Sequence, residues 1–167
     1  MFSVFWKNVY NCPNGKIKEE TEKLARELLE IYAKREVASR PPYLREDEID
    51  IQLAGSFPYE ETPDQAQVIE EIKNDLEKTE PMDRIVCGDV GFGKTEVALR
   101  AMIKVVKSNC QVAMICPTTI LAHQHFQNFK ERLKNLPIKI ALLSRLQTKK
   151  GQKETIEELK TGKIDIA

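Results

Sequence analysis

The sequence predicts an α/β domain in which helices flank a parallel sheet, preceded by an N-terminal helical arm. Short apolar runs at 84–87, 111–116, 138–143 and 164–166 alternate with longer segments of helical periodicity. Strands that alternate with helices in this way form parallel sheets with right-handed crossovers. The length of 167 residues suits one domain with an arm, and a chain of this size buries a substantial core.

The chain divides by pattern into four parts, beginning with residues 1–16, which show no clear period. Residues 17–38 predict a helix, because four apolar side chains recur at helical spacing on one face: Leu24, Leu28, Ile31 and Tyr32. Two prolines stop this helix, and residues 39–56 have the composition of a linker. Residues 57–167 then form the α/β domain.

Within that domain the helix boundaries follow from capping residues. Thr62 and Pro63 open a helix that extends to about residue 78, with Gln65 three residues after the cap. Further helices are expected over about 94–108, 118–133 and 152–159. Gly162 is the expected C-cap of the last one.

Charge and composition exclude several classes of protein. The 26 Lys and Arg residues balance the 26 Asp and Glu residues. The net charge of the chain therefore gives no reason to predict nucleic-acid binding. No apolar run approaches the roughly 18 residues of a membrane span, so we expect no membrane partner. The four cysteines form no CxxC pair, and we expect buried, reduced thiols in a cytoplasmic protein.

Residues 88–95 match the pattern G-x-x-x-x-G-K-[ST] between a predicted strand and a predicted helix. Glycines allow the backbone to approach phosphate, and the following helix directs its positive end toward the anion. Lys94 supplies a charge for the β and γ phosphates, and the Thr95 hydroxyl is the expected ligand of Mg²⁺. The expected nucleotide contacts also include Gly88, Asp89, Val90, Gly91, Phe92, Gly93 and Glu96.

A second candidate segment lies upstream of this loop. The amide of Gln65 can bond to adenine N6 and N7, which would distinguish adenine from guanine. Phe57 or Tyr59 can stack on the base. The alternative is that Gln65 is only the return half of a capping box, and the residues alone leave both interpretations open.

A third segment, Pro117–His125, follows the second strand at the edge of the sheet where ligands bind. Thr118 and Thr119 place hydroxyls and free N–H groups at a helix start, which suits a nucleic-acid phosphate. Residues 130–163 add ten basic and four acidic side chains. This excess is typical either of a solvated face or of a surface that follows a DNA backbone.

The order and spacing of these three segments resemble superfamily 2 helicases. The stretches 57–67, 82–98 and 117–125, together with Ser144-Arg145, are most similar to the family of bacterial transcription-repair coupling factors. The related branch-migrating DNA helicases usually have a small residue where Phe92 stands, and they lack the Ser144-Arg145 pair. They remain the alternative family. The resemblance covers about residues 17–167, and residues 1–16 match poorly.

This resemblance implies a partial RecA-like motor lobe of an ATP-dependent double-stranded DNA translocase. It implies that ATP and Mg²⁺ bind at the segments above. It also implies RNA polymerase and excision-repair proteins as partners of the parent protein. The residues expected on the DNA-contacting segments are Pro117, Thr118, Thr119, Gln124 and Arg145.

In the family, the carboxylates that order Mg²⁺ and the attacking water follow a later strand, and a second motor lobe supplies an arginine finger. Neither is recognisable in these residues. We therefore expect a truncated lobe that binds nucleotide without hydrolysing it efficiently, or an inactive nucleotide-binding or interaction module. A small kinase is disfavoured, because residues 144–163 show only a charged helix where lid and acceptor residues would be needed.

Overall fold

The computed structural model describes residues 15–45 and 47–167. The chain separates into two compact units, the first ending at Ser39 and the second running from Arg40 to Ala167. The unpatterned N-terminal segment expected over 1–16 lies almost entirely outside the described residues.

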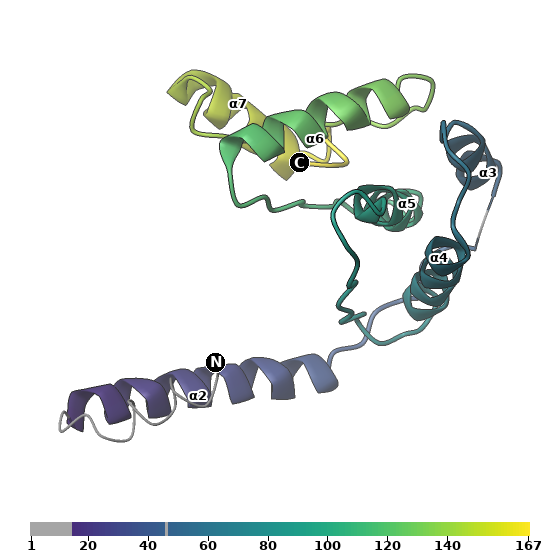
Figure 1. The fold of residues 1–167 in the computed structure, drawn as a ribbon. Coiled ribbons are helices and arrows are strands. Elements are labelled where there is room, and N and C mark those ends of the chain that lie inside the picture. The colour runs from purple at the N-terminus through teal and green to yellow at the C-terminus, as the bar shows by residue number, and fades with distance from the viewer. Residues whose placement is uncertain (1–14, 46) are drawn as a thin grey trace. The chain divides into compact units, whose positions relative to one another are not determined.

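The first unit contains the helix predicted for the arm, which the structure places at α2 (Gly15–Glu36) (Figure 1). Lys34 and Arg35 occupy its last turn, where basic side chains favour the negative end of the helix dipole. Lys34 also pairs with Glu30 one turn earlier, at 2.7 Å. Local spacing therefore accounts for the helix.

The second unit contains five helices among its described residues. They are α3 (Glu48–Gly55), α4 (Pro63–Leu76), α5 (Lys94–Val106), α6 (Thr119–Arg132) and α7 (Lys149–Lys160). The last four match the helices that the sequence predicts in this unit. The C-cap of α7 is Thr161, one residue before the predicted Gly162. Gly162 follows it with φ of 69°, and its N–H donates to the Leu159 carbonyl, as is typical of a glycine just after a helix end.

The expected parallel sheet is only partly present. The described residues contain no extended ladder, but Ile166 forms isolated parallel bridges with Val112 and with Ile140. Residues 164–167 therefore lie between the other two segments. The apolar run 84–87 makes no backbone pairing within the described part of the chain.

This missing pairing corrects one expectation about the cysteines. Cys87 and Cys110 are exposed and Cys116 is only half-buried, so the prediction of buried thiols is wrong for the first two. The physical reason at Cys87 is that the segment carrying it has no neighbouring strand among the described residues to cover it. Ile85 beside it is correspondingly 88% exposed.

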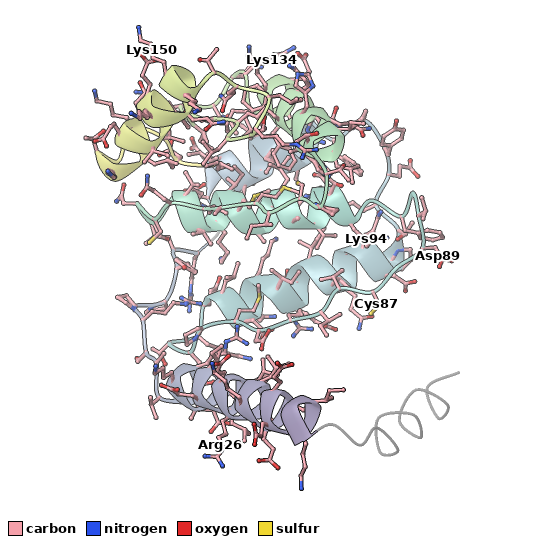
Figure 2. The ribbon with its side chains drawn as sticks, turned by 90° about the vertical axis from the view of Figure 1, so that its left-hand side faces the viewer. Arg26, Cys87, Asp89, Lys94, Lys134 and Lys150 are labelled. Carbon is pink, nitrogen blue, oxygen red and sulfur yellow. The ribbon has the colours of Figure 1, made fainter. Side chains whose placement is uncertain are left out.

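Helix α5 is the central element of the second unit. In Figures 1 and 2 it lies between α4 and the layer that contains α6 and α7. Leu99 and Ile103 on α5 pack with Phe129 of α6, whereas Val97 packs with Ile69 of α4. A helix that is apolar on more than one face must be buried on each of them.

The segment expected as a linker, 39–56, contains a helix that the sequence analysis did not foresee. Asp47 caps α3, and its carboxylate accepts from Ile49 N at 2.8 Å while the Asp50 carboxylate accepts from Asp47 N. Leu53 is 1% exposed and belongs to the core cluster around α5. Residues 48–55 are therefore an integral part of the folded unit.

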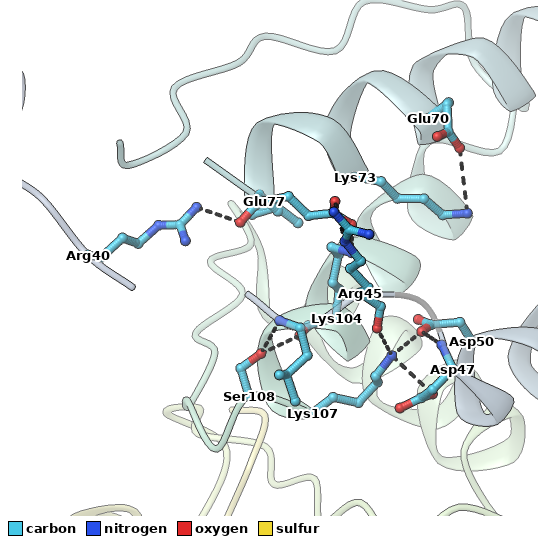
Figure 3. Close-up of polar contacts among 12 residues, drawn as sticks. Arg40, Arg45, Asp47, Asp50, Glu70, Lys73, Glu77, Lys104, Lys107 and Ser108 are labelled. Carbon is cyan, nitrogen blue, oxygen red and sulfur yellow. Dashed lines mark hydrogen bonds and ion pairs between the residues drawn. The ribbon is translucent and has the colours of Figure 1, made fainter. Parts of the chain in front are cut away.

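An ion-pair cluster fastens the C-terminal end of α5 to its neighbours (Figure 3). The buried Lys104 ammonium contacts the Glu77 carboxylate at 2.7 Å. Lys107, one turn later, pairs with Asp47 at 3.0 Å and with Asp50. Because each cation is paired, its burial is compensated, and the far end of α5 is held to α3 and α4.

Candidate nucleotide-binding site

Two glycines set the shape of the loop that leads into α5. Gly91 has φ of 87° and Gly93 has φ of 68°, in the left-handed region that favours glycine. Gly93 is also the N-cap of α5 and offers no side-chain hydrogen bond. The first N–H groups of α5 therefore keep no side-chain cap, and they form the kind of helix start that receives phosphate.

Lys94 extends across this loop. Its ammonium donates to the carbonyl oxygens of Gly88 at 2.6 Å and Asp89 at 2.7 Å. Figure 2 shows Lys94 and Asp89 at the same end of α5. Phosphate oxygens accept from an ammonium more strongly than carbonyls do, so an anion in the loop can take over these bonds.

Gln65 has two structural roles, which bear on the alternatives left open by the sequence. Its Oε1 accepts from Thr62 N at 2.8 Å and its backbone N–H donates to the Thr62 hydroxyl, so both halves of a capping box are present. Its Nε2 donates to the Phe92 carbonyl at 2.8 Å. The side chain thus links α4 to the phosphate loop. Its amide oxygen can still accept one further hydrogen bond, and its NH₂ group can still donate one.

A cleft of about 850 Å³ brings most of the predicted nucleotide residues together, but its lining does not include Gly88, Asp89 or Lys94. Its lining includes Phe57, Tyr59, Gln65, Val90, Gly91, Phe92, Gly93, Thr95 and Glu96. These residues come from the segment before α4, from the first turn of α4, from the loop and from α5. A cleft of this size accommodates a nucleotide.

The lining of this cleft includes an aromatic pair. The rings of Phe57 and Tyr59 meet edge to face with centroids 5.5 Å apart. Tyr59 is 74% exposed, whereas Phe57 is half-buried under two guanidinium groups. The pair therefore offers one anchored ring and one open ring for stacking on a base.

Glu96 differs from its predicted role in one respect, because its carboxylate is committed to two arginines. It contacts Arg132 Nη1 at 2.9 Å and Arg100 Nε at 3.0 Å, and the residue is only 7% exposed. Arg100 pairs in turn with Glu61 at 2.6 Å. Burial lowers the pKa of Arg100, but its hydrogen bonds with Glu96 and Glu61 outweigh burial and raise that pKa above its usual value.

Thr95 lines the cleft directly after Lys94 and is half-buried. Within the described residues, no group of three or more His, Cys, Asp or Glu side chains is placed to hold a metal. Mg²⁺ at nucleotide sites usually binds phosphate oxygens and waters with only one or two protein oxygens. A single hydroxyl at the helix start fits this mode of binding.

The predicted DNA-contacting segment surrounds the start of α6. Thr118 is the N-cap of this helix, and its hydroxyl accepts from Leu121 N at 3.2 Å. Pro117, Thr118 and Gln124 are exposed and Thr119 is half-buried. The segment thus presents side chains and a helix start to a possible phosphate ligand.

Arg145 lies in a turn near the start of α7 and is exposed. Three other basic side chains of the segment 130–163 are paired locally: Lys134 with Glu131, Lys150 with Glu154, and Lys160 with Glu157. Local pairing therefore neutralises part of the excess charge that the sequence shows. Arg145 is among the basic residues without a recorded ion pair in the described part of the chain.

Three residues in or near the cleft were not predicted from the sequence as site residues: Glu61, Arg100 and Arg132. The i, i+4 spacing of Glu96 and Arg100 was a usable signal for one of these contacts. Nothing in the local pattern linked Arg132 to Glu96, which lies 36 residues earlier. Such a contact follows from the packing of α6 beside α5.

A glycine-rich loop that ends in Lys94 and Thr95 at the start of a helix defines the class of phosphate-loop proteins. The DEAD/DEAH box helicase family matches residues 62–167, and the chain belongs to that family. Such a helicase domain implies ATP-dependent activity. No helix in the described residues combines the length and apolarity needed to span a bilayer.

The chain is similar to two transcription-repair-coupling factors in particular. It is 50% identical over 149 residues to that of Borreliella burgdorferi and 45% identical over 161 residues to that of Bacillus subtilis. These matches cover 89% and 96% of this chain but 13% of each relative.

Among solved structures, the chain resembles a structure of RecG bound to a three-way DNA junction. The TM-score is 0.75 with 33% identity, covering 82% of this chain and 19% of the other. Together with the helicase match, this likeness supports a RecA-like fold.

Gly93→Ala tests whether Gln65 braces the loop. A Cβ at Gly93 would lie 2.5 Å from Gln65 Nε2, whereas one at Gly91 meets nothing within 4 Å. Both substitutions place alanine in the left-handed region, at a cost of about 1–2 kcal/mol. We expect Gly93→Ala to lower the free energy of unfolding in urea by more than Gly91→Ala does. Equal losses would show that the contact with Gln65 does not stabilise the loop.

Proposed function

We propose that residues 40–167 form the ATP-binding part of a double-stranded DNA translocase of the transcription-repair coupling type. The cleft that gathers the phosphate loop, Gln65 and the aromatic pair carries this proposal. The similarity to transcription-repair-coupling factors supports the choice of machine. RNA polymerase and excision-repair proteins are proposed as further partners on the strength of that name alone.

The proposed binding mode follows from the contacts of each side chain. Lys94 leaves the carbonyls of Gly88 and Asp89 and meets the phosphates, while the loop and the first turn of α5 donate N–H groups. Thr95 offers its hydroxyl to Mg²⁺, which would supply charge neutralisation at the β and γ phosphates. Phe57 or Tyr59 stacks on adenine, and the remaining bonding capacity of Gln65 reads its edge.

We further propose binding without efficient hydrolysis by these residues. Hydrolysis needs a carboxylate that fixes Mg²⁺ and orients water. The carboxylate of Glu96 is engaged by Arg100 and Arg132. Asp165 is engaged as well, because its Oδ2 accepts from Lys139 N at 2.7 Å. These two carboxylates are thus committed to structural contacts.

The proposal includes the parallel sheet as scaffold. The two parallel bridges of Ile166 support an order in which 164–167 lies between 138–141 and 111–114. Residues 84–87 would join as a further parallel strand leading into the phosphate loop. This arrangement places the loop and the Pro117–His125 segment at the same edge, since parallel strands share their carboxyl ends.

Calorimetry with Mg-ADP and Mg-ATP tests nucleotide binding. Lys94→Ala removes a charged donor, and hydrogen bonds to charged groups contribute about 1.5–3 kcal/mol. We expect that loss in binding free energy, with no change in Lys150→Ala, an exposed lysine on α7. Wild-type protein should prefer ATP to GTP. Unchanged affinity in Lys94→Ala would overturn the phosphate-loop assignment, and equal affinity for GTP would overturn the base-reading role of Gln65.

Titration of a short DNA duplex at several salt concentrations tests the proposed DNA contact. Binding to phosphates should be weak, independent of sequence and reduced steeply by salt. Arg145→Ala should lower affinity and reduce the salt slope by about one. Lys134→Ala, whose ammonium is already paired with Glu131, serves as the matched control. Binding that ignores salt concentration would contradict contact through phosphates.

A further inference from the structure

Arg132, the last residue of α6, lines the cleft and contacts three separate elements around it. Its guanidinium pairs with Glu96 through both Nη atoms, at 2.9 and 3.0 Å. Nη2 also donates to the Leu53 carbonyl of α3 at 3.1 Å. The guanidinium carbon lies 5.3 Å from the centre of the Phe57 ring. One side chain therefore joins α3, α5, α6 and the aromatic segment.

Arg100 makes a second cation–π contact with Phe57. Its guanidinium lies 5.9 Å from the ring centre, and it reaches Glu96 on its own helix and Glu61 beyond the aromatic pair. The two arginines and two glutamates balance in charge. The Arg100 and Arg132 side chains are 11% and 17% exposed, so these contacts are shielded from solvent. Phe57 is thus held by cation–π contacts within a paired network.

The two arginines contact Glu96 from different helices. Arg100 is on the same helix as Glu96 and keeps that contact through local spacing. Arg132 reaches Glu96 from α6, and unlike Arg100 it lines the cleft itself. Its fork binds Glu96 in a fixed plane, a geometry that lysine cannot reproduce. Of the two arginines that contact Phe57, Arg132 has the shorter distance to the ring and comes from a different helix than Glu96.

We propose that Arg132 is a positioning residue that fixes Phe57 as the stacking platform for the base of a bound nucleotide. The inference rests on the proposed nucleotide-binding function. Arg132 acts on affinity for the base through Phe57, and it contributes nothing specific to the phosphates. A purely structural ion pair would instead weaken all ligands of the cleft alike or none of them.

The test compares Mg-ADP with inorganic tripolyphosphate, which has phosphates and no base, on the full chain by calorimetry. Arg132→Ala is expected to weaken ADP binding about three- to tenfold while tripolyphosphate binding is unchanged. Lys94→Ala weakens both ligands. Lys130→Ala, an exposed residue on the same helix, changes neither. Arg132→Lys gives a smaller shift in the ratio of the two affinities than Arg132→Ala.

A double-variant cycle shows whether Arg132 acts through Phe57. In a Phe57→Ala background, adding Arg132→Ala should leave the ratio of ADP to tripolyphosphate affinity unchanged. If the ratio falls equally in both backgrounds, or does not change in the single variant, the inference is overturned. Should Arg132→Ala not fold, as read by circular dichroism, Arg132→Lys replaces it in both comparisons and the same outcomes apply. Wild-type protein that binds neither ligand would instead overturn the proposed function.

Discussion

Burial of α5 on more than one face is the constraint on which the site depends. One face packs with α4 and another with α3 and α6, so the helix axis is fixed from both sides. Its C-terminal end is further held by Lys104 and Lys107. The N-terminal end, which carries Lys94 and Thr95, consequently has a defined position. A phosphate loop needs such a rigid start, because its N–H groups must converge on one anion.

Polar side-chain contacts near the start of α5 connect the elements that line the cleft. Gln65 joins α4 to the loop, and Glu96 joins α5 to α6 through Arg132. The loop and the aromatic residue Phe57 are thus contacted by different side chains, Gln65 and Arg132 respectively. Helix α6 also begins at the candidate DNA-contacting segment, next to the Thr118 cap. A single helix therefore carries groups assigned to both ligands.

Sequence patterns predicted most of the helices because their capping residues and apolar periods are strong local signals. The glycine loop was recognised for the same reason, since its residue types and spacing are dictated by phosphate chemistry. Helix α3 was missed because it is only 8 residues long and follows two prolines. Its Asp47 and Asp50 capping box was a signal that the linker-like composition outweighed.

Features that depend on distant contacts were less predictable. Among the described residues no strand pairs with 84–87, and an apolar run cannot reveal this; the exposure of Cys87 follows from it. The dual contact of Gln65, with Thr62 and Phe92, needed the position of the loop relative to α4. The Arg132–Glu96 pair required the packing of α6. In each case the interaction joins segments that are far apart in sequence or depends on a neighbour outside the local pattern.

Amide hydrogen exchange with and without Mg-ADP tests directly whether a nucleotide binds where the loop meets α5. If a nucleotide binds there, amides of residues 89–96 exchange more slowly when Mg-ADP is present, because these N–H groups bond to phosphate. Amides of α7 should be unaffected. Unchanged exchange over 89–96 at saturating nucleotide, or protection confined to other helices, would contradict the account.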